Sequence, residues 1–195
     1  MSKANRTRKA ILAKAFTLVY KNGYQATSID DIVATTDVTK GALYYHFRNK
    51  EEMGLAMIQE ILAMATQLDT IRPLDQEDRP EVQVYGMMAR LLQNKTFFKV
   101  EYGCPIVNLT EEMAPLNNKF AAELRKLVID WQQMMVSYLE QAKTRQTIRP
   151  DINSEEVATF VIAGYAGARN LGKVLGYSAY DAYLNELKHY LTLLR

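Results

Sequence analysis

The sequence predicts an all-α protein of about nine helices, and three observations support this fold class. Apolar residues recur every three or four positions along most of the chain, which is the period of an amphipathic helix. We find no stretch with the alternating pattern of a β-strand. Capping residues, glycines or prolines separate the periodic stretches, as expected where helices begin and end.

The first helix is predicted from a stripe of Ile11, Ala15 and Val19, and it should end at Gly23. We expect Thr27 to cap a short second helix, with Asp30 three residues later completing an imperfect capping box.

A tight turn over residues 35–38 should join the second helix to a third. Thr39 is expected to cap this third helix, which ends near Phe47, and Asn49 is expected to cap a fourth. Three short helices joined in this way form a helix-turn-helix.

The remaining segments are longer and are separated by proline, glycine or a capping residue. They comprise a loop over 72–80, a helix over 81–95, a shorter helix interrupted near 103–105, a long helix that begins at Pro115, a break over 148–151, a helix from Asn153 to Gly176 and a last helix over 179–194.

Composition restricts the class of protein. The chain is 48% hydrophobic and 24% charged, which is enough for a core and argues against general disorder. No apolar run approaches the roughly 18 residues that span a bilayer. Cys104 is the only cysteine, so no intramolecular disulfide can form. These features predict a cytoplasmic protein.

Positive charge is concentrated at the N-terminus. Residues 1–50 hold nine Lys/Arg against three Asp/Glu, a balance of +6, whereas the rest holds fifteen against nineteen, a balance of −4. Such an asymmetry fits either a solvated basic surface or a nucleic-acid-binding head.

The most informative segment is 39–52, which combines adjacent tyrosines, a histidine, lysines and Gly41. Tyrosine and histidine can hydrogen-bond to phosphate oxygens while lysine supplies charge. A glycine inside a helix costs about 1 kcal/mol relative to alanine, which suggests that another backbone approaches closely. That backbone is most plausibly the sugar-phosphate chain of DNA.

Residues 7 to about 57 resemble the tetracycline-repressor (TetR/AcrR) family of transcriptional regulators. The resemblance is carried by the run Gly41-x-Leu-Tyr-Tyr-His-Phe-x-x-Lys-Glu51, which is far more specific than a generic helix-turn-helix. The turn position that the family often fills with glycine is Asp37, which tolerates a left-handed backbone. We therefore divide the chain into a DNA-binding domain over 1–49 and an effector-binding and dimerisation domain over 50–195.

The position of each residue and the resemblance imply the same DNA contacts. The start of the third helix should meet base edges in the major groove, the next residues should mix groove and phosphate contacts, and two flanking residues should clamp phosphates. The predicted DNA-binding residues are Thr27, Thr39, Lys40, Gly41, Tyr44, Tyr45, His46 and Lys50. Leu43 and Phe47 are expected to face the core.

One head reads only a short half-site, so a homodimer on a palindromic operator is expected. Small residues on the penultimate helix and a leucine stripe on the last could form its interface, or both helices could close the monomer core. The candidate interface residues are Ala163, Gly164, Gly167, Leu184, Leu187 and Leu191. The resemblance implies a four-helix dimer interface.

The body is rich in methionine and aromatic residues, which suit either a plain core or an apolar pocket with a few polar anchors. The resemblance places a pocket for a small-molecule effector here. The candidate lining residues are Met88, Phe98, Tyr102, Cys104, Trp131, Met135, Tyr138, Tyr165 and Arg169. The Gly-Cys-x-x-x-x-Leu pattern at Cys104 resembles a branch of the family that senses electrophiles or oxidants, whereas a buried, inert thiol is the alternative.

Other functions have less support. An enzyme using Cys104 as nucleophile would need a histidine base, and His46 lies in the DNA motif, which leaves His189. No metal-binding or nucleotide-binding motif occurs, so no metal and no cofactor are expected. A helical interaction protein, or a DNA-binding regulator without any effector, remains open as a third class. The sequence thus predicts a DNA-binding repressor without enzymatic activity and without a membrane partner.

Overall fold

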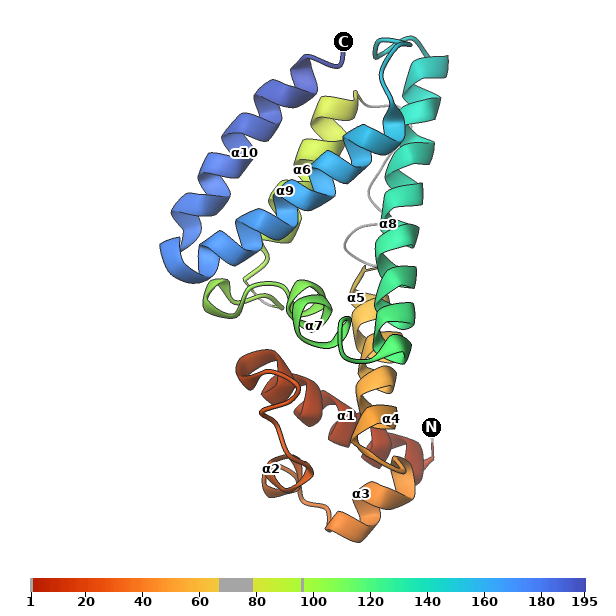
Figure 1. Cartoon of the computed structure of the whole chain (residues 1–195), viewed down its shortest axis with the longest axis vertical. Coiled ribbons are helices and arrows are strands. Elements are labelled where there is room, and N and C mark those ends of the chain that lie inside the picture. The colour runs from red at the N-terminus through yellow and green to blue at the C-terminus, as the bar shows by residue number, and fades with distance from the viewer. Residues whose placement is uncertain (1, 67–78, 96) are drawn as a thin grey trace. The chain divides into compact units, whose positions relative to one another are not determined.

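The structure is a computed structural model that describes residues 2–66, 79–95 and 97–195. Every regular element within these residues is a helix, which confirms the predicted fold class (Figure 1). The predicted loop over 72–80 lies almost wholly outside them. The chain forms two compact units: unit 1 comprises Met1–Ala65 with Pro105–Arg125, and unit 2 comprises Thr66–Cys104 with Lys126–Arg195.

Unit 1 begins with α1 (Lys3–Asn22), whose predicted apolar stripe is buried. The helix ends at Gly23, which has a φ of 92° and donates its N–H to the Val19 carbonyl. Glycine adopts this left-handed φ without steric cost, so the predicted stop is confirmed.

The second helix, α2 (Ile29–Ala34), is capped by Ser28 rather than by Thr27. Ser28 and Asp31 exchange side-chain and backbone hydrogen bonds in a complete capping box. The Thr27 hydroxyl instead donates to the Gly23 carbonyl at 2.7 Å. The prediction was wrong by one residue because Thr27 closes the turn after α1 and is buried there.

Helix α3 (Lys40–His46) is capped by Thr39, as predicted, and ends at Phe47. Figure 1 shows α2 and α3 together at one edge of unit 1, with α1 packed beside them. Among the described residues, Gln146 is the only non-glycine residue with a positive φ. Asp37 therefore does not adopt a left-handed backbone. The turn between α2 and α3 therefore needs no glycine.

Asn49 caps the fourth helix, as predicted. This helix runs through α4 (Lys50–Ala56), a π-helical segment (Met57–Leu62) and α5 (Ala63–Thr66). Unit 1 also contains α7 (Pro105–Met113) and the first residues of α8 (Asn118–Thr144), which begins three residues after the predicted Pro115. The division into units thus differs from the predicted boundary at residues 49 and 50, because these later helices pack onto the head.

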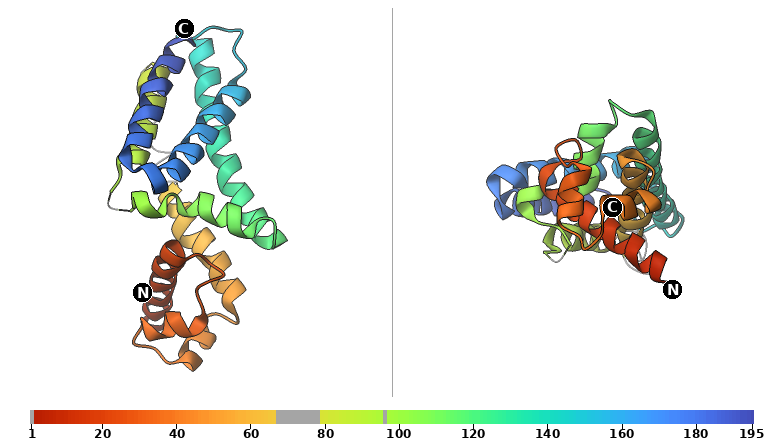
Figure 2. Two further views of the ribbon diagram at one scale, coloured as in Figure 1. Left: turned by 60° about the vertical axis from the view of Figure 1, so that its left-hand side comes forward. Right: turned by 90° about the horizontal axis from the view of Figure 1, so that it is seen from below.

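Unit 2 contains α6 (Pro80–Gln93), a 3-10 turn (Val100–Tyr102), the rest of α8, α9 (Ser154–Leu175) and α10 (Tyr177–Thr192). Figures 1 and 2 both show α10 lying beside α9 and α6. Asn153 caps α9 and Gly176 ends it, as predicted. No helix in the described part of the chain is long and apolar enough to cross a membrane.

Candidate nucleic-acid interface

Helix α3 divides its residues between the core and solvent as a recognition helix requires. Leu43 and Phe47 are buried, as predicted. Tyr44 is 44% exposed and Tyr45 is 80% exposed, although each side chain carries a large apolar ring. The exposed aromatic pair is therefore available to a partner outside the chain.

Gly41 lies on the exposed side of α3 and has no structural need to be glycine. A Cβ built there would meet only the Thr39 hydroxyl oxygen, at 3.9 Å. Its φ does not lie in the left-handed range. The space next to Gly41 is thus open to solvent, and the backbone of a binding partner could approach the helix there.

Lys40, at the first position of α3, is held by an acid of α2. Its Nζ lies 2.7 Å from Asp30 Oδ1, and both side chains are more than half exposed. The hydrogen bond and charge of Asp30 raise the pKa of Lys40, so the lysine stays protonated. A phosphate would have to compete with Asp30 for this cation.

Lys50, at the start of α4, is half-buried rather than free in solvent. Its Nζ donates to the Gln25 carbonyl at 3.3 Å and lies 4.5 Å from the centre of the Tyr24 ring. Burial lowers the pKa of Lys50, while Glu112 and Asp31 oppose that shift. Lys50, which is predicted to contact a phosphate, is thus already bound to the turn after α1.

The other predicted contacts fall into two groups. His46 is half-buried and lies edge-on to Tyr45, with ring centres 5.1 Å apart, while Thr39 is exposed and accepts the Ala42 N–H at 3.2 Å. Thr27 is fully buried, so its prediction as a phosphate contact is wrong in this structure. The adjacent hydroxyl of Ser28 is exposed and occupies the helix start instead.

In unit 2, several residues predicted to line an effector pocket meet around a buried guanidinium. Arg169 is 1% exposed and donates to the Leu91 carbonyl and to the hydroxyls of Tyr165, at 3.1 Å, and Tyr180, at 3.2 Å. Its guanidinium also lies 4.4 Å from the Phe98 ring centre. Burial and then the neighbouring Cys104 raise the pKa of Tyr165, which keeps the phenol neutral. We call Phe98, Cys104, Tyr165, Arg169 and Tyr180 the Arg169 cluster.

The remaining predicted lining residues lie in or near the core. Trp131 packs edge-on to Tyr165, with ring centres 5.2 Å apart, and its buried Nε1 has no hydrogen-bond partner among the described residues. Met88, Met135 and Tyr138 are buried, and Tyr102 is half-buried. These positions are compatible with the core alternative.

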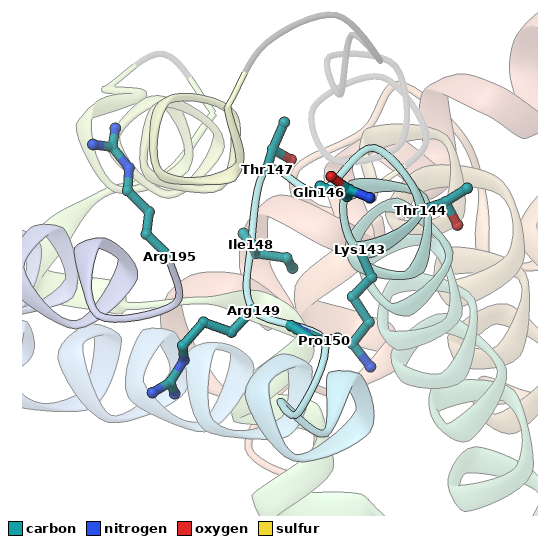
Figure 3. A pocket seen from close by; sticks show the side chains of 8 residues that line it. All are labelled: Lys143, Thr144, Gln146, Thr147, Ile148, Arg149, Pro150 and Arg195. Carbon is teal, nitrogen blue, oxygen red and sulfur yellow. The ribbon is translucent and has the colours of Figure 1, made fainter.

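An open pocket of about 740 Å³ lies elsewhere in unit 2, where the loop after α8 meets the end of α10. It carries the cations Lys143, Arg149 and Arg195, but Figure 3 shows these three side chains pointing in different directions. Ligand sites normally have converging polar groups, so this pocket is a weak candidate for the effector.

The leucines predicted at a dimer interface face inward. Leu184, Leu187 and Leu191 are 3% exposed or less, because α10 packs this stripe onto its own subunit. A Cβ on Gly164 would lie 2.5 Å from Tyr183 of the same chain, so this glycine serves packing within the subunit. The prediction that these leucines lie at a dimer interface was therefore wrong. They close the core of their own subunit, which was the alternative.

The outward face of α9 carries the other two predicted residues and several larger apolar ones. Phe160, Leu171 and Val174 are 54%, 56% and 85% exposed. Ala163 and Gly167 are exposed between them. We call these five residues the α9 stripe. Phe160, Leu171 and Val174 were missed, because the sequence prediction for this helix considered only its small residues.

Comparison with known proteins identifies the family. Residues 11–57 match the model for bacterial regulatory proteins of the tetR family, and residues 80–186 match a tetracycline-repressor-like C-terminal domain. The described residues hold no group of three or more His, Cys, Asp or Glu suited to a metal ion.

Two relatives and one solved structure illustrate the similarity. An uncharacterized HTH-type transcriptional regulator in the lacX 3' region of Lactococcus lactis is 32% identical over 68% of each chain. The HTH-type transcriptional repressor DhaR of a Mycobacterium species is 28% identical over 83% of this chain and 79% of its own. A TetR-family regulator from Cytophaga hutchinsonii has a TM-score of 0.88 and 22% identity, covering 100% of this chain and 98% of its own, and supports the fold. The chain belongs to the TetR family of DNA-binding transcriptional regulators.

Proposed function

We propose that this regulator is a dimeric repressor that binds a palindromic operator and is released by a small, largely apolar effector. It would act in the cytoplasm, without a catalytic step of its own. The observation that carries the proposal is the exposed face of α3, where Gly41 opens onto empty space beside Tyr44 and Tyr45. Polar aromatics that tolerate water suit a groove and its phosphates better than a protein interior.

The α9 stripe supports dimerisation. An exposed apolar face this long usually marks a protein contact, because isolated subunits seldom leave such a surface in water. Apart from the backbone of its own helix and its two chain neighbours, no described residue lies within 4 Å of a Cβ built on Gly167, so a partner helix could approach closely there. We infer that a second copy covers this stripe, which would pair two heads on two half-sites.

The Arg169 cluster supports an effector site in unit 2. Aromatic rings surround a buried cation, and in the part of the chain that the structure describes the nearby Trp131 N–H has no acceptor. A ligand with an apolar body and an acceptor group would satisfy both the rings and that N–H.

A response to oxidants or electrophiles through Cys104 is the alternative. Its thiol is 3% exposed and interacts with Tyr165 and with the Arg169 guanidinium. Burial limits the access of reagents to this thiol. Cys104→Ser should leave DNA binding in the absence of oxidant unchanged, and loss of peroxide-induced release in this variant would favour the alternative.

The main proposal is tested with DNA selected by the protein itself. The wild-type protein is used to enrich duplexes from a random-sequence pool, and a palindromic consensus is expected. Gly41→Leu should bind this duplex at least 100-fold more weakly while its thermal unfolding stays close to that of wild type, since the added side chain points into open space. Wild-type affinity in Gly41→Leu, or a selected pool without a consensus, would contradict the proposal.

Dimerisation is tested separately. Val174→Glu places a charge on the most exposed residue of the α9 stripe, and it should shift the protein from dimer to monomer in sedimentation experiments. The matched control is Leu193→Glu, which changes another exposed leucine, 69% accessible, outside the stripe. If both variants remain dimeric, the stripe is not the interface.

A further inference from the structure

A carboxylate of α7 holds the turn that joins α1 to α2. Glu112 accepts hydrogen bonds from the Tyr24 N–H at 2.9 Å and from the Gln25 N–H at 2.7 Å. A Cβ on Gly23 would lie 3.4 Å from both Glu112 oxygens. Two backbone donors on one ionised acceptor form a strong, oriented contact, so the path of the chain between α1 and α2 is set by α7.

The Tyr24 ring ties the same turn to two further helices. It packs against Phe120 of α8, with ring centres 4.9 Å apart. It also lies over Gly54 of α4, where a Cβ would come within 2.7 Å of Tyr24 and 2.5 Å of Phe120. Burial, followed by the charges of Glu51 and Glu112, raises the pKa of Tyr24 to about 12, so the ring stays neutral. The turn is therefore anchored from three sides.

Lys50 connects this anchor to DNA binding. Its Nζ donates to the carbonyl of Gln25, whose N–H is bound by Glu112. The Glu112 charge acts on Lys50 in the direction that raises its pKa. Glu112 thus orders the segment that positions Lys50, and its negative charge also opposes a phosphate near that lysine.

Glu112 also lines the seam between α7 and α1. The crevice lined by Phe16, Tyr20, Leu109 and Glu112 has a volume of only about 10 Å³, roughly the space of one water molecule. Glu112 is half-buried there, so its carboxylate is partly shielded from solvent.

We propose that Glu112 is a positioning residue for DNA recognition, which fixes the turn over residues 23–25 and, through it, α2 and Lys50. Two opposite effects follow. The ordered turn favours the one geometry that fits the operator, whereas the negative charge weakens binding to any duplex. Glu112 therefore raises the ratio of operator affinity to non-specific affinity. The inference rests on DNA binding by the head and is independent of the effector proposal.

The test compares two conservative variants on two duplexes. Glu112→Gln keeps the reach and one acceptor oxygen but loses the charge, and Glu112→Asp keeps the charge but is one methylene shorter. Probes are the duplex selected by the wild-type protein and a scrambled duplex of equal length. Glu111→Gln, which removes an exposed charge from the preceding position of α7, is the matched control.

We expect both Glu112 variants to bind the selected duplex about three- to tenfold more weakly. On the scrambled duplex, Glu112→Gln should bind up to about twofold more tightly, because a repelling charge is gone, and Glu112→Asp should match the wild type. Glu111→Gln should preserve the ratio of the two affinities. A wild-type ratio in both Glu112 variants, or an equal loss on both duplexes, would overturn the inference.

Amide hydrogen exchange adds a direct readout of the turn. In the DNA-free protein, the Tyr24 and Gln25 amides should exchange at least tenfold faster in Glu112→Asp, while the Asp31 amide, bound by Ser28, should keep its rate. Unchanged protection at Tyr24 and Gln25 would also overturn the proposal. If the wild type itself shows no preference between the duplexes, the proposed operator binding fails instead, so the two failures are distinguishable.

Discussion

Helices α3 and α9 differ in the chemistry of their exposed faces. On α3, Tyr44 and Tyr45 are exposed and Gly41 faces open space. On α9, Tyr165 and Arg169 are buried. The outward face of α9 is apolar, whereas that of α3 is polar and aromatic. This difference in chemistry underlies the two proposed partners: nucleic acid for α3 and a second protein surface for α9.

The strongest way to test this contrast is to remove the buried cation of α9. Arg169→Ala would leave a cavity and leave the Leu91 carbonyl and two tyrosine hydroxyls without their donor. We expect the free energy of unfolding to fall by about 3–5 kcal/mol, as for other large buried side chains, measured by urea denaturation.

Arg169→Met is the matched control, because it fills much of the same volume without charge. Buried ionic groups can often be replaced by apolar residues of similar size at small cost, so its loss should be clearly smaller. Equal losses in the two variants would mean that the hydrogen bonds, rather than the filled volume, dominate the stability of the cluster.

The next largest effect should come from two glycines of unit 1. Gly54→Ala would push a methyl group to 2.5 Å from Phe120 and 2.7 Å from Tyr24. It should cost about 1–3 kcal/mol of stability, as overpacking does. The added methyl of Gly41→Ala would lie at an ordinary contact distance, 3.9 Å, from the Thr39 hydroxyl oxygen. This variant should therefore stabilise α3 by up to about 1 kcal/mol while weakening operator binding. Chemical denaturation measures the free energy of unfolding of both variants. A Gly54→Ala variant as stable as the wild type would contradict the packing described.

The smallest effect concerns Glu51, where α4 meets the start of α8. Its carboxylate accepts from Lys119 Nζ at 2.5 Å and from Asn117 at 2.7 Å, and these bonds lower the pKa of Glu51. Because the folded carboxyl binds its proton less readily than the unfolded one, the pair stabilises the fold above pH about 4.5. This contribution is lost as the pH falls through the lower pKa of the folded state.

Glu51→Gln should therefore unfold at a lower temperature than the wild type at pH 7. The difference in unfolding temperature should shrink on acidification below pH about 4.5. A difference that stays constant from pH 7 to pH 3 would show that the ion pair does not contribute. Glu111→Gln again supplies the control for loss of one acidic charge from unit 1.

Helix ends were predicted best, because capping depends on residues within about four positions. Thr39, Asn49 and Asn153 cap their helices, and Gly23 and Gly176 end theirs. One miss, Thr27, shows the limit of such patterns. Two adjacent hydroxyl residues can both cap a helix, and only the packing of Thr27 against the turn after α1 decides for Ser28.

The candidate site was predicted unevenly for the same reason. The exposed face of α3 follows from its spacing, because Leu43 and Phe47 must turn inward and their neighbours outward. The leucines of α10 have an equally clear stripe, yet periodicity alone does not distinguish a core face from a dimer face. Glu112 was missed, because an acidic residue on a helix carries no local sign of a partner 88 residues away.

The amino-acid sequence by itself determined the helices, most of their ends, the recognition motif and the family, since all of these depend on short-range order along the chain. Tertiary structure decided which stripe of α9 and α10 is covered, which hydroxyl caps α2, and which acid holds the turn before it. These features depend on contacts between distant segments. Such contacts form only when the apolar faces of several helices are buried together, and no spacing within one helix encodes them.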